Sequence, residues 1–117
     1  MSDCLFCKIA SGEIPADVVA TSDTALAFRD IQPRTRVHVL VVPRDHHETL
    51  AGMAAVDAQG AADLFTLAGE VAAAEGIADT GYRLISNVGE DGGQEVGHVH
   101  VHLLGGQRVG PMVATRG

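Results

Sequence analysis

The chain of 117 residues has few aromatic residues, few cysteines and few basic residues. It has no tryptophan and only 3% aromatic residues, so valine, leucine, isoleucine and alanine must fill its core. Its two cysteines lie close together, which excludes the disulfide framework of a small secreted domain. Eight lysines and arginines against fifteen acidic residues give a net charge of −7, and this balance argues against binding to nucleic acid.

Long hydrophobic runs are also missing. No basic start is followed by an apolar stretch, so we expect no signal peptide, and no apolar run approaches the length of about 18 residues that a membrane span needs. We therefore expect a cytoplasmic protein that binds no membrane. The length and the hydrophobic content of 46% fit one compact domain over residues 1–117.

The order of apolar segments and turn residues predicts an α+β fold. Helices are expected over residues 4–10 and 57–75, the second because its apolar residues recur at helical spacing. This order of a short helix, three strands, a long helix and two strands indicates a five-stranded antiparallel sheet. The expected strands are residues 18–20, 24–29, 37–42, 82–86 and 97–104.

Three histidines alternate with apolar residues near the C-terminus, in the run His98-Val-His100-Val-His102-Leu-Leu. Successive side chains of a strand point to opposite faces, so the three imidazoles are expected on one face and the apolar side chains on the other. Such a face is consistent with part of a zinc site, with a nucleophilic imidazole held between two neighbours, or with a polar surface in water.

A glycine-rich segment precedes these histidines, from Asn87 to Gln94. Glycine has no Cβ, so it lets backbone N–H groups converge on an anion. No Gly-Lys-Ser/Thr follows, and a strand rather than a helix comes next, so the segment is neither a Walker loop nor a dinucleotide fingerprint. Joined to the histidines, it predicts a phosphate site that presents a substrate to a nucleophilic histidine.

Cys4 and Cys7 form a Cys-x-x-Cys pair near the N-terminus. Such a pair indicates half of a zinc site, a redox dithiol or a packing contact. No strand precedes the pair to complete a thioredoxin-like unit, which argues against the redox interpretation. A zinc site needs two more ligands, and His46 and His98 are the candidates, with His47 as an alternative to His46.

The segment from Asn87 to Gly106 resembles the signature of the histidine-triad (HIT) superfamily, His-φ-His-φ-His-φ-φ, in which φ is an apolar residue. The Gly105-Gly106 ending and the lead-in from Gly81 to Arg83 are similar to the Hint-type branch, the purine nucleoside phosphoramidases. The resemblance extends over nearly the whole chain. It implies a HIT fold and a hydrolase that cleaves nucleoside 5′-phosphoramidates, of adenosine type, at the α-phosphorus through a nucleotidyl-histidine intermediate.

The resemblance also implies a role for each matching residue. His100 matches the nucleophile, His102 the histidine that contacts the phosphate or the leaving group, and His38 a fourth histidine buried behind the nucleophile. Asp30 matches the carboxylate that binds the ribose. Glu95 replaces a serine of some members, and because an ionised carboxylate cannot donate a hydrogen bond, we expect only its backbone N–H to contribute. The residues that match the apolar slot around the base are Phe6, Ile9, Ile14, Phe28 and Ile31, and those that match the phosphate contacts are Asn87, Gly93 and Gln94.

Zinc is a further implication of the resemblance. Many bacterial members bind zinc through a similar cysteine pair, a histidine after the third strand and the first triad histidine, which here are Cys4, Cys7, His46 and His98. A closed Cys2His2 site would be structural. The alternative is a pair of reduced thiols with no metal.

Other functions are consistent with the same residues. A dinucleoside polyphosphate hydrolase or a nucleotidyl transferase would use the same site, and a zinc-stabilised nucleotide sensor or adaptor would bind a purine nucleotide with little turnover. Members of the branch are homodimers, with the long helices and C-terminal strands at the interface. Their C-terminal tail, here residues 109–117, approaches the partner's site, although a frayed end is the alternative.

Overall fold

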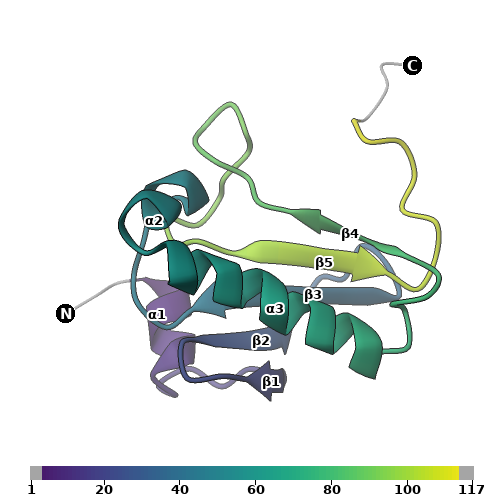
Figure 1. Ribbon diagram of the computed structural model, residues 1–117, viewed down its shortest axis with the longest axis horizontal. Helices are drawn as coiled ribbons and strands as arrows, with labels where there is room; N and C mark the ends of the chain where they lie inside the picture. The colour runs from purple at the N-terminus through teal and green to yellow at the C-terminus, as the bar shows by residue number, and fades with distance from the viewer. Residues whose placement is uncertain (1–3, 114–117) are drawn as a thin grey trace.

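The computed structural model describes residues 4–113, and the predicted tail of residues 109–117 lies partly outside them. The strands form a five-stranded sheet of order β1-β2-β3-β5-β4, in which all neighbouring strands are antiparallel (Figure 1). The predicted α+β fold is therefore confirmed. The elements are α1 (Leu5–Ala10), β1 (Val18–Thr21), β2 (Ala25–Arg29), β3 (Val37–Pro43), α2 (Leu50–Val56), α3 (Ala58–Ala74), β4 (Tyr82–Ile85) and β5 (Val101–Gly105).

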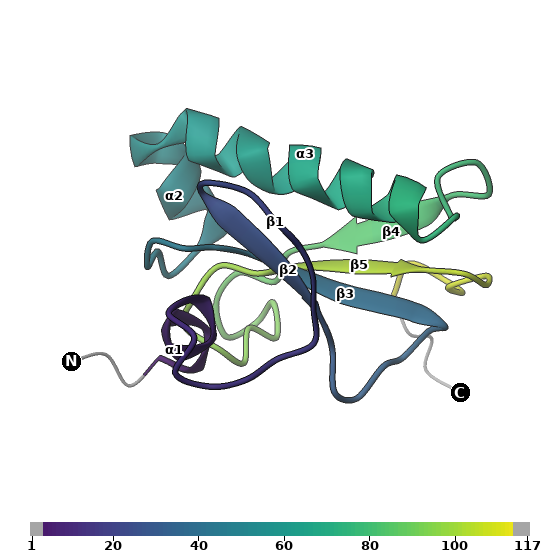
Figure 2. The ribbon, with the colours of Figure 1, turned by 90° about the horizontal axis from the view of Figure 1, so that it is seen from below.

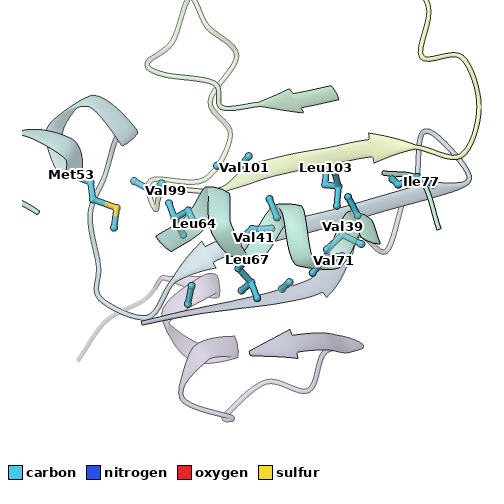
Figure 3. Packing of buried hydrophobic residues seen from close by; sticks show 14 residues of the cluster. Val39, Val41, Met53, Leu64, Leu67, Val71, Ile77, Val99, Val101 and Leu103 are labelled. Carbon is cyan, nitrogen blue, oxygen red and sulfur yellow. The ribbon is translucent and has the colours of Figure 1, made fainter. Parts of the chain in front are cut away.

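The sheet separates two hydrophobic clusters. Helix α3 covers one face, and the short helix α1 lies on the other (Figure 2). Val39 and Val41 of β3 face α3 and pack with Leu64 in the larger cluster (Figure 3). Leu40, which lies between the two valines in the sequence, joins Phe6 of α1 in the smaller cluster. Because side chains alternate along a strand, His38 and His102 share the α1 side with Leu40.

Helix α3 is the long helix that the apolar spacing predicts. Its N-cap is Asp57, whose side chain accepts a hydrogen bond from the Gly60 N–H at 2.9 Å, and its buried stripe includes Leu64, Leu67 and Val71. Helix α2 was not predicted, because only Met53 of its seven residues is buried and no apolar repeat marks it. No helix within residues 4–113 has both the length and the apolar character for crossing a membrane.

Strand β5 is shorter than the sequence predicts. It begins at Val101 rather than at residue 97, so His98 and His100 precede it and only His102 lies within it. The β3–β5 ladder ends at the Val41–Val101 pair. Beyond it, the His98 ring bonds the Pro43 carbonyl oxygen and the Val99 N–H bonds the His47 carbonyl oxygen. Val99 and Val101 are nevertheless buried in the larger cluster, as the alternation predicts.

Candidate active site and metal cluster

Two groups of side chains with metal-binding chemistry contain His98 and His102, the histidines on either side of His100 in the sequence. In each group, one ligand atom from every residue lies within 4.8 Å of the others. His100 is linked to both, because its ring bonds the His98 backbone and lies 5.1 Å from the His102 ring, centroid to centroid. The first group is Cys4, Cys7, His46 and His98, and the second is Asp30, His38 and His102.

In the first group, the sulfur and nitrogen atoms converge on one point. Cys4 Sγ lies 3.3 Å from His98 Nδ1, Cys7 Sγ lies 3.3 Å from His46 Nδ1, and the two Nδ1 atoms are 3.1 Å apart. The structure therefore brings together the four predicted ligands, with His46 rather than His47. Two thiols and two imidazoles in this arrangement have the donor set of a closed structural zinc site.

The other ring nitrogen of His98 supports this interpretation. His98 Nε2 lies 2.9 Å from the Pro43 carbonyl oxygen, which can only accept, so Nε2 carries the proton and donates it. Nδ1 then presents its lone pair to the sulfur atoms. A metal-binding histidine is held in this way, with its far N–H bonded to a carbonyl or carboxylate. Burial lowers the pKa of His98, which keeps the ring neutral and able to bind a metal.

His100 has the geometry of a nucleophile. Its Nδ1 lies 2.9 Å from the His98 carbonyl oxygen and donates to it, so the neutral ring has its lone pair on Nε2. The ring is buried and meets the edge of Phe6 at a centroid distance of 5.1 Å. The backbone carbonyl sets the tautomer of His100, and Phe6 restricts the orientation of its ring.

His38 has the same tautomer as His98, but its protonated nitrogen points towards its own cluster. The Arg34 backbone N–H donates to His38 Nδ1 at 3.1 Å, so the proton of the neutral ring is on Nε2. His38 Nε2 lies 3.0 Å from His102 Nδ1 and 3.4 Å from Asp30 Oδ2. When His38 donates to His102 Nδ1, the proton of neutral His102 is on its Nε2.

The His38 and His102 rings are both neutral near pH 7. Burial lowers the pKa of His38, and burial together with the neighbouring His100 and His38 lowers the pKa of His102 to about 4. The two rings thus form a chain of N–H donors that ends at His102 Nε2, beside His100.

His38 was expected to lie buried behind the nucleophile. Its ring is buried in the structure and contacts His102, and its place behind the nucleophile stays a prediction. The register of β3 and β5 explains this contact, because His38 lies opposite Leu104, one diagonal position from His102.

The glycine-rich loop takes its shape from positive backbone angles and from one side chain. Gly89 and Gly93 have φ angles of +72° and +80°, which glycine adopts without strain. The Gln94 amide bonds Gly89, Glu48 and Val96 within the protein. The remaining predicted residues differ in exposure, with Asn87 half-buried and Glu95 exposed.

The residues predicted to surround the nucleotide base differ in how deeply they are buried. Phe6 and Phe28 are buried in the smaller cluster, where their rings meet edge to face with centroids 5.7 Å apart. Ile9 and Ile14 are half-buried, whereas Ile31 is 95% exposed. An apolar side chain so exposed is available to a planar base, and the slot itself stays a prediction.

Three residues with backbone roles at these sites were not predicted, namely Arg34, Pro43 and Glu48. Arg34 contributes its N–H, and Pro43 and Glu48 contribute their carbonyl oxygens. Almost any residue type offers these groups, so no side-chain pattern marks them.

Residues 11–109 match the model of the HIT domain family. The chain is 45% identical to the purine nucleoside phosphoramidase of Escherichia coli (strain K12), over 97% of this chain and 95% of that protein. Its fold matches the crystal structure of a HIT family hydrolase from Legionella pneumophila Philadelphia 1, with a TM-score of 0.87, 48% identity and coverage of 91% of this chain and 95% of that one. It also matches a histidine triad protein from Clostridium difficile, with a TM-score of 0.91, 39% identity and coverage of 97% and 98%. The chain therefore belongs to the HIT family.

Proposed function

We propose that the chain is a nucleotide-binding hydrolase that cleaves nucleoside 5′-phosphoramidates of adenosine type at the α-phosphorus. The observation that supports it best is the hydrogen bond from His100 Nδ1 to the His98 carbonyl oxygen, which leaves Nε2 as the attacking atom. The 45% identity to a purine nucleoside phosphoramidase supports the substrate class.

In the first step, His100 Nε2 attacks the α-phosphorus and the bond from phosphorus to the amine nitrogen breaks. The positive charge of the nucleotidylated ring is stabilised by the His98 carbonyl oxygen through the Nδ1–H. In the second step, water attacks the phosphorus, the bond to Nε2 breaks, and the products are a nucleoside 5′-monophosphate and one proton.

The state of His102 indicates where the leaving amine obtains its proton. His102 is neutral near pH 7, and giving up its proton would leave an anionic ring. We therefore assign to His102 Nε2 a hydrogen bond to the phosphate or leaving group. The substrate reacts with its nitrogen protonated, as P–NH2⁺–R, so that the neutral amine RNH2 departs with the electron pair of the P–N bond. Asp30, whose Oδ1 accepts from the Gln32 N–H at 2.8 Å, keeps further lone pairs for the ribose hydroxyls.

The experiment combines turnover with trapping. Incubation with an adenosine phosphoramidate labelled in the nucleotide should release the amine and leave label on the protein after an acid-free quench, with none on His100→Ala. Nucleotide binding without amine release from a panel of phosphoramidates, and with His100→Ala indistinguishable from wild type, would contradict the proposal. Cleavage of dinucleoside polyphosphates but of no phosphoramidate would mean that the site acts on dinucleoside polyphosphates instead.

We propose that the Cys4–Cys7–His46–His98 cluster binds one structural zinc ion. The convergence of the four donor atoms and the bond from His98 Nε2 to Pro43 support it. The ion would fix the N-terminal segment to the backbone that precedes the nucleophile, and a closed sphere leaves no open position for substrate. Metal analysis of untagged protein should find about one zinc per chain.

We propose that the protein is a homodimer. Strand β4 pairs with β5 on one side and forms the edge of the sheet within residues 4–113, and Phe65 of α3 is 42% exposed. An open strand edge and an apolar side chain are therefore both available to a second copy. Light scattering coupled to gel filtration should give twice the mass of the 12.1 kDa chain.

A further inference from the structure

The Gln94 carboxamide uses both of its N–H donors inside the protein. Nε2 donates to the Glu48 carbonyl oxygen at 2.6 Å and to the Val96 carbonyl oxygen at 3.0 Å, while Oε1 accepts from the Gly89 N–H at 3.0 Å. Since carbonyl oxygens only accept and an N–H only donates, these partners fix which end of the amide is nitrogen. No side-chain N–H of Gln94 is left to donate to a phosphate.

These bonds hold the glycine-rich loop in its shape. Gly89 and Gln94 bond each other twice, because the Gln94 backbone N–H also donates to the Gly89 carbonyl oxygen at 3.1 Å. The turn between them is closed by a bond from the Gly93 N–H to the Glu90 carbonyl oxygen at 3.0 Å. The direction of the loop N–H groups therefore depends on Gln94.

The side chain of Gln94 thus forms a brace between the glycine-rich loop and residue 48. The end of this brace at residue 48 lies beside the metal cluster. His46, His47 and Glu48 are consecutive, and each contacts the loop or the segment that contains the triad. His46 Nδ1 lies 3.1 Å from His98 Nδ1, the His47 carbonyl oxygen accepts from the Val99 N–H at 2.8 Å, and the Glu48 carbonyl oxygen accepts from Gln94. A shift of His46 would therefore be transmitted through these three consecutive residues to the loop.

We propose that Gln94 is a positioning residue that ties the glycine-rich loop to residues 46–48, so that metal in the Cys4–Cys7–His46–His98 cluster stiffens the loop. The assignment of this loop to phosphate binding rests on the proposed hydrolase function, whereas the mechanical coupling rests only on the proposed zinc site. The competing interpretation is a direct contact between the Gln94 amide and the substrate phosphate.

Two substitutions and a control separate these interpretations. Gln94→Met removes all three side-chain bonds, and Gln94→Glu keeps the shape and the bond from Gly89 but faces the Glu48 and Val96 carbonyl oxygens with a carboxylate. Glu48→Ala is the control, because it removes an exposed side chain and keeps the carbonyl oxygen. In protein free of nucleotide, amide exchange in residues 89–97 should accelerate about fivefold or more in both Gln94 variants and stay unchanged in the control.

The turnover readout uses the same variants. Loss of loop geometry should lower kcat/KM for a phosphoramidate about tenfold to a hundredfold, mainly through kcat. Exchange in residues 89–97 that equals wild type in both Gln94 variants, together with a raised KM alone, would overturn the proposal in favour of direct contact. Gln94→Glu also serves if Gln94→Met does not fold.

The coupling itself is tested by removing metal. A chelator should accelerate exchange in residues 89–97 of the wild type and should add little in Gln94→Met, where the brace is already absent. An equal effect in both proteins, or no effect of chelator on the wild-type loop, overturns the coupling. Because exchange is measured without turnover, a protein that cleaves no phosphoramidate but shows this pattern contradicts the proposed function and leaves the coupling intact.

Discussion

The two histidine clusters contain similar ligand atoms but hold their protons in opposite ways. In the Cys4–Cys7–His46–His98 cluster, His98 Nε2 points away from the other ligands and donates to a carbonyl oxygen. His98 Nδ1, which faces the other ligands, therefore has its lone pair available. In the Asp30–His38–His102 cluster, His38 Nδ1 points away from the other two residues and accepts from the Arg34 N–H. His38 Nε2, which faces them, therefore carries a proton. A metal on His38 Nε2 would require a proton on Nδ1, where it would meet another N–H at 3.1 Å.

The difference shows that the backbone group bonded to one ring nitrogen of a histidine decides whether the other ring nitrogen offers a lone pair or a proton. A carbonyl oxygen behind the ring prepares a metal ligand or a nucleophile, as at His98 and His100. A backbone N–H behind the ring prepares a proton donor, as at His38. A search by ligand type alone treats the two clusters as equivalent, although only one of them suits a metal.

The largest effect is expected from removing His100, the proposed nucleophile that lies between the clusters. His100→Ala should lower turnover of an adenosine phosphoramidate about 10⁴-fold or more, because the covalent route is lost. Amine release is the measurement, and unchanged zinc content is the control. A residual rate within tenfold of wild type would mean that water attacks the phosphorus directly.

The contrast between the clusters is tested most directly by metal content. Cys4→Ser should reduce zinc from about one per chain to well below that and lower the thermal unfolding temperature, since structural zinc contributes several kcal/mol to folding. His38→Gln should keep the full zinc content. The comparison fails if zinc falls in His38→Gln as much as in Cys4→Ser.

A smaller effect is expected from deleting one backbone donor. Arg34→Pro removes the N–H that fixes the His38 tautomer, and kcat should fall about tenfold to a hundredfold, as for a misplaced catalytic group. Arg34→Ala keeps the N–H and is the matched control. Nitrogen NMR shifts of His38 should report an Nε2–H ring in wild type and in the control. A wild-type ring with its proton on Nδ1 would refute this assignment.

The smallest effect concerns stability against pH. The folded pKa of His102, about 4, lies below the ordinary value of 6.5, so the unfolded chain binds more protons between these pH values. Stability should therefore fall as pH drops from 6.5 towards 4, by about 2–3 kcal/mol from this residue. Urea unfolding of wild type and His102→Gln should show a weaker pH dependence in the variant. Parallel curves would show that His102 does not contribute.

Much of the fold and of the metal cluster is predictable because side-chain patterns encode them. The apolar spacing of α3 and the alternation around Val99 and Val101 place these residues in the core, as found. The cysteine pair predicts part of a metal site and the resemblance to the HIT family implies its four ligands, which the structure brings together. These features depend on which side chain stands at which position.

The rest depends on tertiary pairing or on backbone atoms. The contact of His38 with His102 follows from the register of β3 against β5, which no local pattern specifies. Beyond the early end of the β3–β5 ladder, the His98 ring and the Val99 N–H bond backbone carbonyl oxygens, which no side-chain pattern marks. The bracing role that we propose for Gln94 was likewise hidden, since its main partners lie in residue 48 and in the loop itself.

Helix α1 connects thiol chemistry with catalysis. Cys7 lies within it and Cys4 is its N-cap, while Phe6 between them meets the edge of the His98 and His100 rings, with centroids 5.9 and 5.1 Å away. In protein stripped of metal, an alkylating agent that modifies either sulfur would displace this helix together with the Phe6 ring that packs against His100. Thiol reagents should therefore inhibit the metal-free protein without touching a proposed catalytic residue, and bound zinc should protect it.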